Sequence, residues 1–323
     1  MMPAVASRGT PFVGRDEEVA RLHAAADRAD TGRAQVVLVR GDAGIGKSRL
    51  VTESLARLGA GARQLRGFCV DGGDQAMPLL PLVTVLRQVP KLAGRDRARD
   101  LLRGLPPLAR SLGLGEDGEG GSAPPPPLVA PAGAGEPLYG TVLDLVIELS
   151  ADNLLVLVVE DVHWADPATL ALLSFLARAA EDERLLLVAT YRDRELHRRH
   201  PLRRTVAELI RLPGVAEIDL APLGRGPIGA LAAAWVGGPL GEAALDALLA
   251  RGEGNPFFTE QLLAARLAGH DELPAAVGDL LAGRVEELPE VVQAVLRALA
   301  ATGPGTPPEL LAAATGLAAG DVE

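Results

Sequence analysis

Cysteine and long apolar segments are both scarce in this sequence, and each scarcity excludes a class of protein. Cys69 is the one cysteine among 323 residues, so no disulfide can form within the chain, which fits a reducing compartment. It lies in the apolar run RQLRGFCV, and we interpret it as a small core residue. The N-terminal stretch MMPAVASRGTPFVGR lacks the apolar region of a secretory signal, and the longest apolar run, NLLVLVVEDV, is too short to span a bilayer. We therefore expect a cytoplasmic location and no membrane partner.

The chain also has fewer basic than acidic residues. The chain carries 32 Lys and Arg against 42 Asp and Glu, a net charge of −10. Because such a chain gains little from releasing the counterions of a polyanion, it is a poor candidate for sequence-independent binding of nucleic acid or of an anionic membrane. Its length and its hydrophobic content of 48% allow one large or two to three smaller globular units.

Short apolar runs alternate with segments of helical periodicity up to residue 220. The runs predict buried strands at Val36–Val39, Gln64–Val70, Leu154–Val159, Leu185–Thr190 and Val215–Leu220. The periodic segments predict helices at Asp16–Ala29, Lys47–Leu58, Leu79–Val89, Leu138–Leu149, Pro167–Ala179 and Leu202–Arg211. Strands that alternate with helices predict an α/β fold, in which helices cover a parallel sheet.

Two parts of the chain depart from this alternation. The segment Gly113–Pro137 is rich in glycine and proline, and we expect a disordered insertion there rather than a domain boundary. After residue 220 the strand pattern stops, and the sequence predicts helices that Gly and Pro separate. The pattern ends abruptly after a predicted helix and a turn, which we interpret as the sign of a fragment of a longer protein.

A glycine-rich motif follows the first predicted strand and opens the next predicted helix. The stretch GDAGIGKS fits the pattern G-x-x-x-x-G-K-S/T of a phosphate-binding loop in its required context. Its glycines allow a tight turn whose N–H groups cradle phosphates, while Lys47 reaches the β- and γ-phosphates and Ser48 binds Mg²⁺. The alternative is a glycine-rich turn that only caps a helix. The expected nucleotide-binding residues here are Gly41, Asp42, Ala43, Gly44, Ile45, Gly46, Lys47, Ser48 and Arg49.

A second polar site follows the third predicted strand. Magnesium-dependent phosphate chemistry needs a carboxylate on a neighbouring strand to hold the metal, and often a second one to polarise the attacking water. Glu160 and Asp161 meet this need, since ligands bind at the carboxyl ends of parallel strands. Glu160 takes the usual position of the metal-binding carboxylate and Asp161 that of the catalytic one, but the order Glu-Asp leaves their division of labour open. Two solvated acids at a strand end are the alternative.

Four further residues lie near these strand ends, and three of them, Asp166, His163 and Arg192, have two interpretations each. Asp166 precedes Pro167, and we prefer a helix N-cap to a catalytic role. For His163 a structural role is preferred to a contact with the γ-phosphate. Thr190 and Arg192 end the fourth predicted strand, where a polar or cationic group can sense the γ-phosphate. For Arg192 a solvated surface position has equal weight, because other arginines follow it closely.

Taken together, these motifs resemble a known family. PFVGRDEEVARL, GDAGIGKSRL, LVLVVEDVHWADPATLALLSFLAR, LLLVATYRD and GNPFFTEQLL occur here in one order. As a set they resemble the ATPase module of the signal-transduction ATPases with numerous domains (STAND), an AAA-like class of P-loop proteins. Within that class the chain is similar to the large ATP-binding LuxR-type bacterial regulators and their maltose-regulator-like relatives. The resemblance extends from about Pro11 to Ala314.

The resemblance implies an ATP/ADP switch that works with Mg²⁺. Such proteins hold ADP in a closed form, and exchange for ATP opens them and leads to self-association. It also implies an ATPase core at 1–220 in which Val13, Gly14 and Arg15 lie near the adenine and ribose. A helical lid at 221–273 would touch the nucleotide through Pro256, and 274–323 resembles the start of a winged-helix domain. The alternative for Pro256 is that Asn255 and Pro256 only separate two helices.

Four functions are therefore compared. The preferred one is a slowly hydrolysing ATPase switch, the N-terminal part of a LuxR-family transcriptional regulator, whose DNA binding needs a helix-turn-helix absent from this sequence. The alternatives are the ATPase module of a cyclase or kinase fusion, an origin-binding or DNA-loading AAA+ ATPase, and a binding module without turnover. The acidic character of 274–323 counts against DNA loading, and Glu160 and Asp161 count against the last alternative.

Overall fold

The computed structural model describes residues 10–59, 61–71, 78–103, 109, 114, 135–197, 200–267, 285, 289–302 and 307–317. The chain divides into two compact units, Met1–Leu231 and Ala232–Glu323. The insertion predicted at Gly113–Pro137 lies outside the described residues, apart from Leu114 and the helical residues 135–137.

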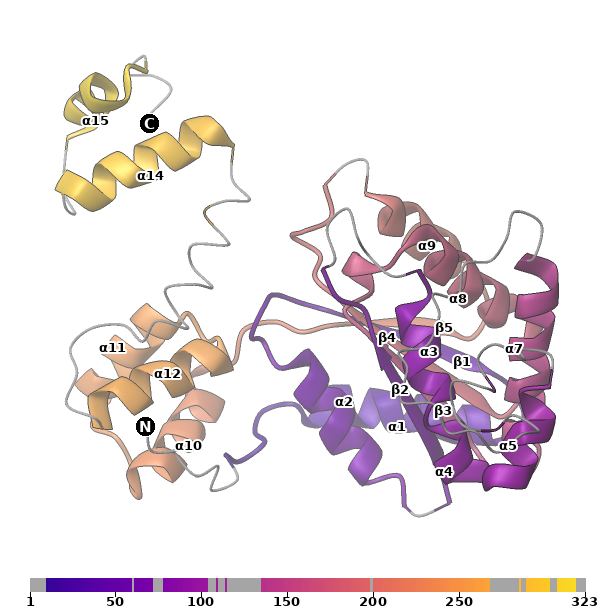
Figure 1. Ribbon diagram of the computed structural model, residues 1–323. Helices are drawn as coiled ribbons and strands as arrows, with labels where there is room; N and C mark the ends of the chain where they lie inside the picture. Colours follow the sequence, from indigo (N-terminus) through magenta and orange to yellow (C-terminus); the bar gives the residue numbers. More distant parts are fainter. Residues whose placement is uncertain are drawn as a thin grey trace. The chain divides into compact units, whose positions relative to one another are not determined.

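A five-stranded parallel sheet forms the centre of the first unit (Figure 1). The strands are β1 (Gln35–Arg40), β2 (Arg63–Phe68), β3 (Leu155–Glu160), β4 (Leu185–Tyr191) and β5 (Val215–Asp219). Their order in the sheet is β2-β3-β4-β1-β5, and every pairing is parallel. The five predicted strands are confirmed, each to within two residues at either end.

Successive side chains of the three central strands, β1, β3 and β4, enter two different cores. On one face, Val37 of β1 packs with residues of α1 (Asp16–Asp30) and α2 (Lys47–Ala56). On the other face, Val36 joins a core with α3 (Leu80–Leu86), α4 (Val89–Ala93), α5 (Arg95–Leu101), α7 (Gly135–Ser150), α8 (Pro167–Ala179) and α9 (Pro201–Leu209). Burial on both faces explains why these three strands are continuous apolar runs, whereas the outer strands β2 and β5 are less buried and include charged residues. The predicted α/β architecture is confirmed (Figure 1).

The helices of this unit follow the predicted periodicity, with one break. α8 begins and ends at the predicted residues, and α7 begins three residues before the predicted start at Leu138. The single helix predicted at Leu79–Val89 is wrong at its end, since α3 stops at Leu86 and α4 begins at Val89. Pro90 explains the break, because its ring removes an N–H and clashes with the preceding helical turn.

A side chain closes the outer edge of β2. Gln88, which lies between α3 and α4, accepts a hydrogen bond from the N–H of Arg66 at 3.0 Å and donates one to the Arg66 carbonyl at 2.6 Å. Its amide thereby replaces part of the pairing that another strand would supply, and it protects an edge that could otherwise pair with a second chain.

The described residues of the second unit form helices and no strand, as predicted from residue 221 onward. α10 (Arg225–Val236) contains the boundary between the units, and α11 (Glu242–Gly252), α12 (Pro256–Leu267), α14 (Glu290–Thr302) and α15 (Pro308–Thr315) follow. The winged-helix start predicted for 274–323 is not confirmed. Among the helices described in either unit, none has the length and apolar character that a membrane span requires.

Candidate nucleotide-binding site

The predicted phosphate loop connects β1 to α2 at the carboxyl edge of the sheet. Gly46 caps α2 with a φ of 102°, in the left-handed region that side chains rarely adopt. Gly41 has a φ of 153°, and a Cβ there would lie 2.9 Å from Cγ2 of Ile45 and 3.1 Å from the Leu220 carbonyl oxygen. The loop therefore needs glycine at both positions, and it leads directly into the helix N-terminus that favours an anion.

Lys47, the first residue of α2, is buried against the loop that precedes it. Its Nζ donates to the carbonyl oxygens of Gly41 at 2.9 Å and Asp42 at 3.0 Å. Burial lowers the pKa of this amine to about 8; Asp161 acts in the opposite direction, and Arg192 lowers the pKa further. A phosphate would offset the positive charge that burial disfavours, so the surroundings of Lys47 fit an anionic ligand.

Ser48 and Glu160 bring together a hydroxyl and a carboxylate. The Ser48 hydroxyl donates to Oε2 of Glu160, which joins the start of α2 to the end of β3. Mg²⁺ takes hydroxyl and carboxylate oxygens together with waters and substrate phosphates, so this pair fits the metal. The other carboxylate oxygen of Glu160 lies 3.3 Å from Nη1 of Arg66, on β2.

Glu160 does not stand on the strand next to the phosphate loop, which corrects the prediction. β4 pairs with both β1 and β3 and separates them, because the order of strands along the chain does not set their order in a parallel sheet. The end of β4 takes part in the site instead. Thr190, fully buried, accepts a hydrogen bond from the N–H of Asp161 at 3.0 Å. Asp161 has a left-handed φ of 55°, and this bond holds the turn that carries its carboxylate.

Arg192 follows β4 and is held by its neighbours. Nη1 of Arg192 donates to Oε1 of Glu195, and the guanidinium carbon lies 5.0 Å from the ring centre of Trp164. These contacts favour a placed side chain over the solvated surface position. Burial raises the pKa of Glu195, but hydrogen bonds from His163 and Arg192 outweigh it, so this pKa lies below its usual range. The His163 side chain has no exposed surface, which favours its structural interpretation.

Asp166 caps α8, as the sequence predicted. Its Oδ1 accepts hydrogen bonds from the N–H groups of Ala168 at 2.9 Å and Thr169 at 3.1 Å. Its Oδ2 accepts a third from the N–H of Leu79 at 3.0 Å. The Asp166 carboxylate therefore caps α8 and connects it to Leu79, the residue before α3. Both of its oxygens are engaged in these hydrogen bonds.

Arg15, assigned to the adenine and ribose end of the site, contacts the phosphate loop. Its Nη2 donates to the carbonyl oxygens of Ala221 at 2.7 Å and Ile45 at 3.3 Å, and the residue is buried. Gly14 has a φ of 66°, and a Cβ there would lie 2.4 Å from Cγ of Pro227. The segment before α1 is therefore fitted closely against the loop and the start of α10.

The remaining predicted nucleotide contacts stay predictions. Arg49 donates to the carbonyl oxygen of Thr10, and Val13 belongs to the same N-terminal segment. Pro256 lies in the second unit at the start of α12, where Oδ1 of Asn255 accepts the N–H of Phe257 at 3.0 Å. These contacts are those expected if Asn255 and Pro256 separate two helices and start α12.

Three charged residues of the site were not predicted: Arg66, Glu195 and Arg194. Glu195 follows Arg192 by three residues, and that spacing was a usable signal. Arg194, whose Nε lies 3.0 Å from Oδ1 of Asp42, and Arg66 gave no such signal. Their contacts depend on which strands are neighbours, and sequence order does not reveal this.

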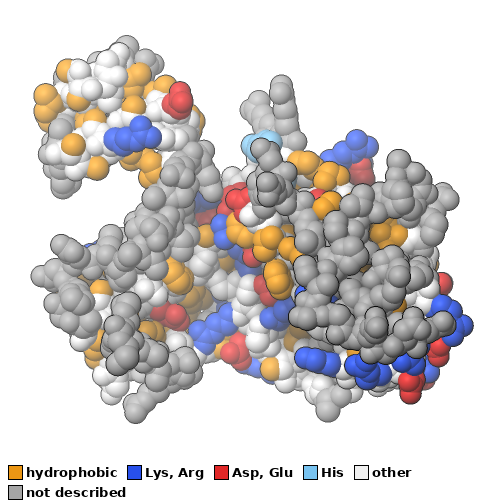
Figure 2. All heavy atoms as spheres, in the orientation of Figure 1, with side chains coloured by type: hydrophobic (Ala, Val, Ile, Leu, Met, Phe, Trp, Pro, Cys, Tyr) orange, Lys and Arg blue, Asp and Glu red, His pale blue; other side chains and the backbone are white. Residues whose placement is uncertain are grey.

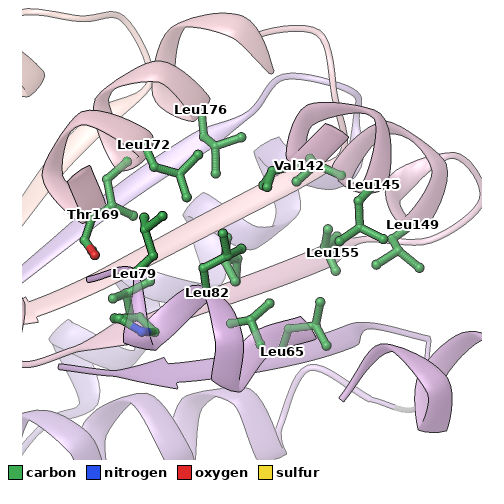
Figure 3. Close-up of a pocket in the computed structure, with 16 residues that line it drawn as sticks. Leu65, Leu79, Leu82, Val142, Leu145, Leu149, Leu155, Thr169, Leu172 and Leu176 are labelled. Carbon is green, nitrogen blue, oxygen red and sulfur yellow. The ribbon is translucent and has the colours of Figure 1, made fainter. Parts of the chain in front are cut away.

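An apolar cavity of about 40 Å³ lies between the sheet and the helices α3, α7 and α8 (Figure 3). Leu65 of β2, Leu82 of α3 and Leu145 of α7 point into it, and Thr169 is the one polar residue among the 16 that line it. The Thr169 hydroxyl donates to Asp166. The cavity has neither the volume nor the polar groups for a nucleotide, so we interpret it as a gap in core packing.

A family model described as an AAA ATPase domain matches residues 11–188, more than half of the chain. The chain belongs to this family. Membership implies nucleotide binding, typically with Mg²⁺. An uncharacterised protein of Rhizobium meliloti (strain 1021) is 31% identical to this AAA ATPase over 202 residues, 57% of the chain. The chain spans about a fifth, 19%, of the length of that relative.

A comparison with solved structures found one with the same fold. The Walker-type ATPase PABY2304 of Pyrococcus abyssi has a TM-score of 0.53 at 15% identity, with 96% of this chain and 90% of that chain covered. This likeness shows a shared fold. A STAND protein with a tetratricopeptide repeat sensor from Pyrococcus horikoshii has a TM-score of 0.43 at 15% identity, with 96% of this chain and 40% of that chain covered.

Proposed function

We propose that this AAA ATPase module is a nucleotide-controlled switch. In this proposal it binds ATP or ADP with Mg²⁺, hydrolyses ATP slowly, and signals through the difference between the two bound states. One observation carries the proposal: four groups meet at the carboxyl edge of one sheet, namely the loop with Lys47, the Ser48–Glu160 pair, Asp161 and Arg192. They supply partners for the phosphates, the metal and the attacking water, which is the set that phosphoryl transfer needs.

Each group has a separate task. Lys47 and the N–H groups of the loop hold the phosphates, and Ser48 and Glu160 hold Mg²⁺, which draws electron density from the phosphoryl oxygens when bound. Because Glu160 already contacts Ser48, we assign it the metal and assign Asp161 the attacking water. The bond from Asp161 N–H to Thr190 supports this division, since it holds the turn of Asp161 in place. Arg192 senses the γ-phosphate.

The switch belongs to a larger regulator in this proposal. The motif pair EDVHWAD and GNPFF supports a STAND-type protein similar to the LuxR-family regulators. ADP would keep the module closed, ATP would open it and lead to self-association, and DNA would be bound by a helix-turn-helix outside these 323 residues. The matched region makes up 19% of the Rhizobium relative, so a module of this kind occurs there within a longer chain.

The nucleotide content of the purified chain tests this function. The chain is denatured, and any released nucleotide is identified by ion-exchange chromatography and mass spectrometry. We expect close to one ADP per chain in the wild type and roughly a hundredfold weaker retention in Lys47→Ala, because the charged contact to the phosphates is lost. Lys91→Ala is the matched control: Lys91 is the only other lysine, and it is exposed on α4.

The result also separates a switch from a motor. Retained ADP that leaves only on exchange with ATP supports the switch. A chain that purifies empty and turns ATP over steadily contradicts it, as does equal nucleotide retention in the Lys47→Ala and Lys91→Ala variants.

A further inference from the structure

Four side chains at the ends of β3 and β4 contact one another in a closed circuit. His163 and Trp164 come from the short helix η2 (Val162–Trp164) after β3, and Arg192 and Glu195 follow β4. Glu195 accepts from Arg192 on Oε1, and its Oε2 lies 2.9 Å from Nε2 of His163. Trp164 closes the circuit, with its ring 5.0 Å from the Arg192 guanidinium and 4.5 Å from the His163 ring. We call His163, Trp164 and Glu195 the Arg192 clamp.

The clamp is shielded from water at its centre. The His163 side chain is 0% exposed, whereas that of Glu195 is 18% exposed and that of Arg192 is 26% exposed. Ion pairs on an open surface restrict their members little, but a shielded carboxylate that accepts from Arg192 and lies against His163 restricts the side chains on both sides of it. Nδ1 of His163 also lies 3.9 Å from Oδ1 of Asp161, so the clamp begins beside the carboxylate assigned to the attacking water.

An arginine that detects a third phosphate gains from being placed in advance. Its long side chain otherwise loses rotamer freedom each time it binds, and this loss weakens the contact. Nε of Arg192 is buried and has no hydrogen-bond partner within the described part of the chain, so the clamp does not use every donor of the guanidinium. The charge of Arg192 also acts on Lys47, which places the two cations within electrostatic range of each other.

We propose that His163 is a positioning residue: through Glu195 it fixes the guanidinium of Arg192 and thereby sets how well the site distinguishes ATP from ADP. The inference rests on the proposed function, which gives Arg192 the γ-phosphate as its ligand. In this role His163 offers Nε2, which lies 2.9 Å from Oε2 of Glu195, as the polar partner of that carboxylate, and it does not touch the nucleotide.

Two substitutions separate this role from simple packing. His163→Phe keeps a ring against Trp164 and removes the donor. His163→Gln removes the ring and keeps an N–H that can reach the position of Nε2. If packing against Trp164 were all that mattered, the phenylalanine would be the milder change. In our proposal the glutamine is the milder change, because only the donor controls Arg192.

The experiment measures the dissociation constants of ADP and of a non-hydrolysable ATP analogue, both with Mg²⁺, by calorimetric titration of the nucleotide-free full chain. Arg192→Ala gives the reference loss of discrimination. We expect His163→Phe to shift the ADP-to-analogue ratio about tenfold toward ADP, as loss of one charged contact does, with ADP affinity itself within about twofold of wild type. His163→Gln should restore most of the ratio. The double variant His163→Phe, Arg192→Ala should match Arg192→Ala alone.

Matched controls keep the result interpretable. His23→Gln replaces a histidine on α1 whose Nε2 faces the carbonyl oxygen of Ser54 at 2.9 Å, and it should leave the ratio unchanged. If His163→Phe does not fold, as judged by circular dichroism, Glu195→Gln takes its place, because it removes the charge that holds Arg192 with little change in volume.

Three results overturn the inference. A folded His163→Phe with the wild-type ratio shows that the clamp does not set discrimination, and effects of His163→Phe and Arg192→Ala that add show that His163 acts independently. A folded Glu195→Gln variant with the wild-type ADP-to-analogue ratio would likewise show that the clamp does not set discrimination. These results leave the proposed function standing, whereas a wild-type chain that binds neither nucleotide overturns both.

Discussion

Among single residues, Tyr191 shows that polar groups at the carboxyl edge of the sheet pair with one another. It is fully buried at the end of β4, and its hydroxyl donates to Glu217 of β5. Arg40, at the end of β1, lies 3.6 Å from Glu217 and 2.8 Å from Asp219. A hydrogen bond to Asp219 raises the pKa of Arg40, and burial acts in the opposite direction. The strand ends are thus joined by charge as well as by backbone pairing.

The two tyrosines of the chain should resist ionisation in the native state. Burial raises the pKa of Tyr191, and its bond to Glu217 raises it further; burial and the charge of Asp166 raise the pKa of Tyr139. Above pH of about 10, where an unfolded phenol loses its proton, the native state holds more protons than the unfolded state. Stability present below that pH is therefore lost as the pH rises further.

Ultraviolet titration checks this directly. At a pH of about 10.5 the native chain should show less than half of the tyrosinate absorbance of the chain in urea. Tyr139→Phe and Tyr191→Phe assign the remaining signal. A native titration curve that overlays the unfolded one contradicts the burial of Tyr191 against Glu217.

Among elements, β2 and α3 make a contact so close that it requires a glycine. A Cβ on Gly67 of β2 would lie 2.5 Å from the carbonyl oxygen of Pro81 and 3.0 Å from its Cα. The obstacle is backbone, which cannot rotate away as a side chain can. Gly67 therefore sets the distance at which α3 covers the edge strand that Gln88 protects.

Gly67→Ala should destabilise the chain by roughly 1–3 kcal/mol, because α3 must move outward to make room. Gly61→Ala is the matched control, since Gly61 is exposed just before the same strand and a Cβ there meets nothing within 4 Å. The control should stay within about 0.5 kcal/mol of wild type. Urea unfolding measures both, and equal effects of the two substitutions would contradict the close packing of α3.

The sequence was sufficient to predict most strands and helices, but it was not sufficient to predict which strands lie side by side in the sheet. Continuous apolar runs predicted β1, β3 and β4, because these strands are buried on both faces. β2 and β5 are less completely buried and were predicted as well. The position of β4 between β1 and β3 could not be predicted, because helices join the strands and any order satisfies the same local pattern. The break between α3 and α4 could have been predicted from Pro90, whose effect is local.

Some residues of the candidate site could likewise be predicted from the sequence, and others could not. Lys47, Ser48 and Glu160 were predicted from motifs, because phosphate and metal chemistry restricts residue type at fixed spacing. Arg66 and Arg194 were missed, since each is defined by a partner far along the chain. For the same reason the sequence suggested a role for Arg192 but not the side chains that hold it.

For the whole molecule, net charge is divided unevenly between the two units. Residues 232–323 carry 13 acidic and 4 basic residues, so −9 of the total of −10 belongs to the second unit. The first unit is close to neutral. Figure 2 shows its acidic and basic side chains interspersed on one face, in keeping with ion pairs such as Arg204–Glu208. Neither unit therefore has the excess of positive charge that draws a protein to nucleic acid.

This charge distribution predicts that the chain does not bind duplex DNA. Sequence-independent binding depends on cations that release counterions from the phosphates, and the second unit, where a DNA-loading ATPase would carry its winged helix, has the opposite sign. Fluorescence anisotropy of a labelled duplex at low salt should show no binding up to about 10⁻⁴ M protein. The same duplex should change the rate of ATP hydrolysis less than about twofold.

Low salt makes the test severe, because any electrostatic attraction is strongest there. Binding that weakens steeply as salt is added would mean that local basic groups overcome the overall charge. If hydrolysis also rose severalfold with DNA, the DNA-loading alternative would replace the switch. Absence of both effects, together with retained ADP, would support the proposed switch over the DNA-loading alternative.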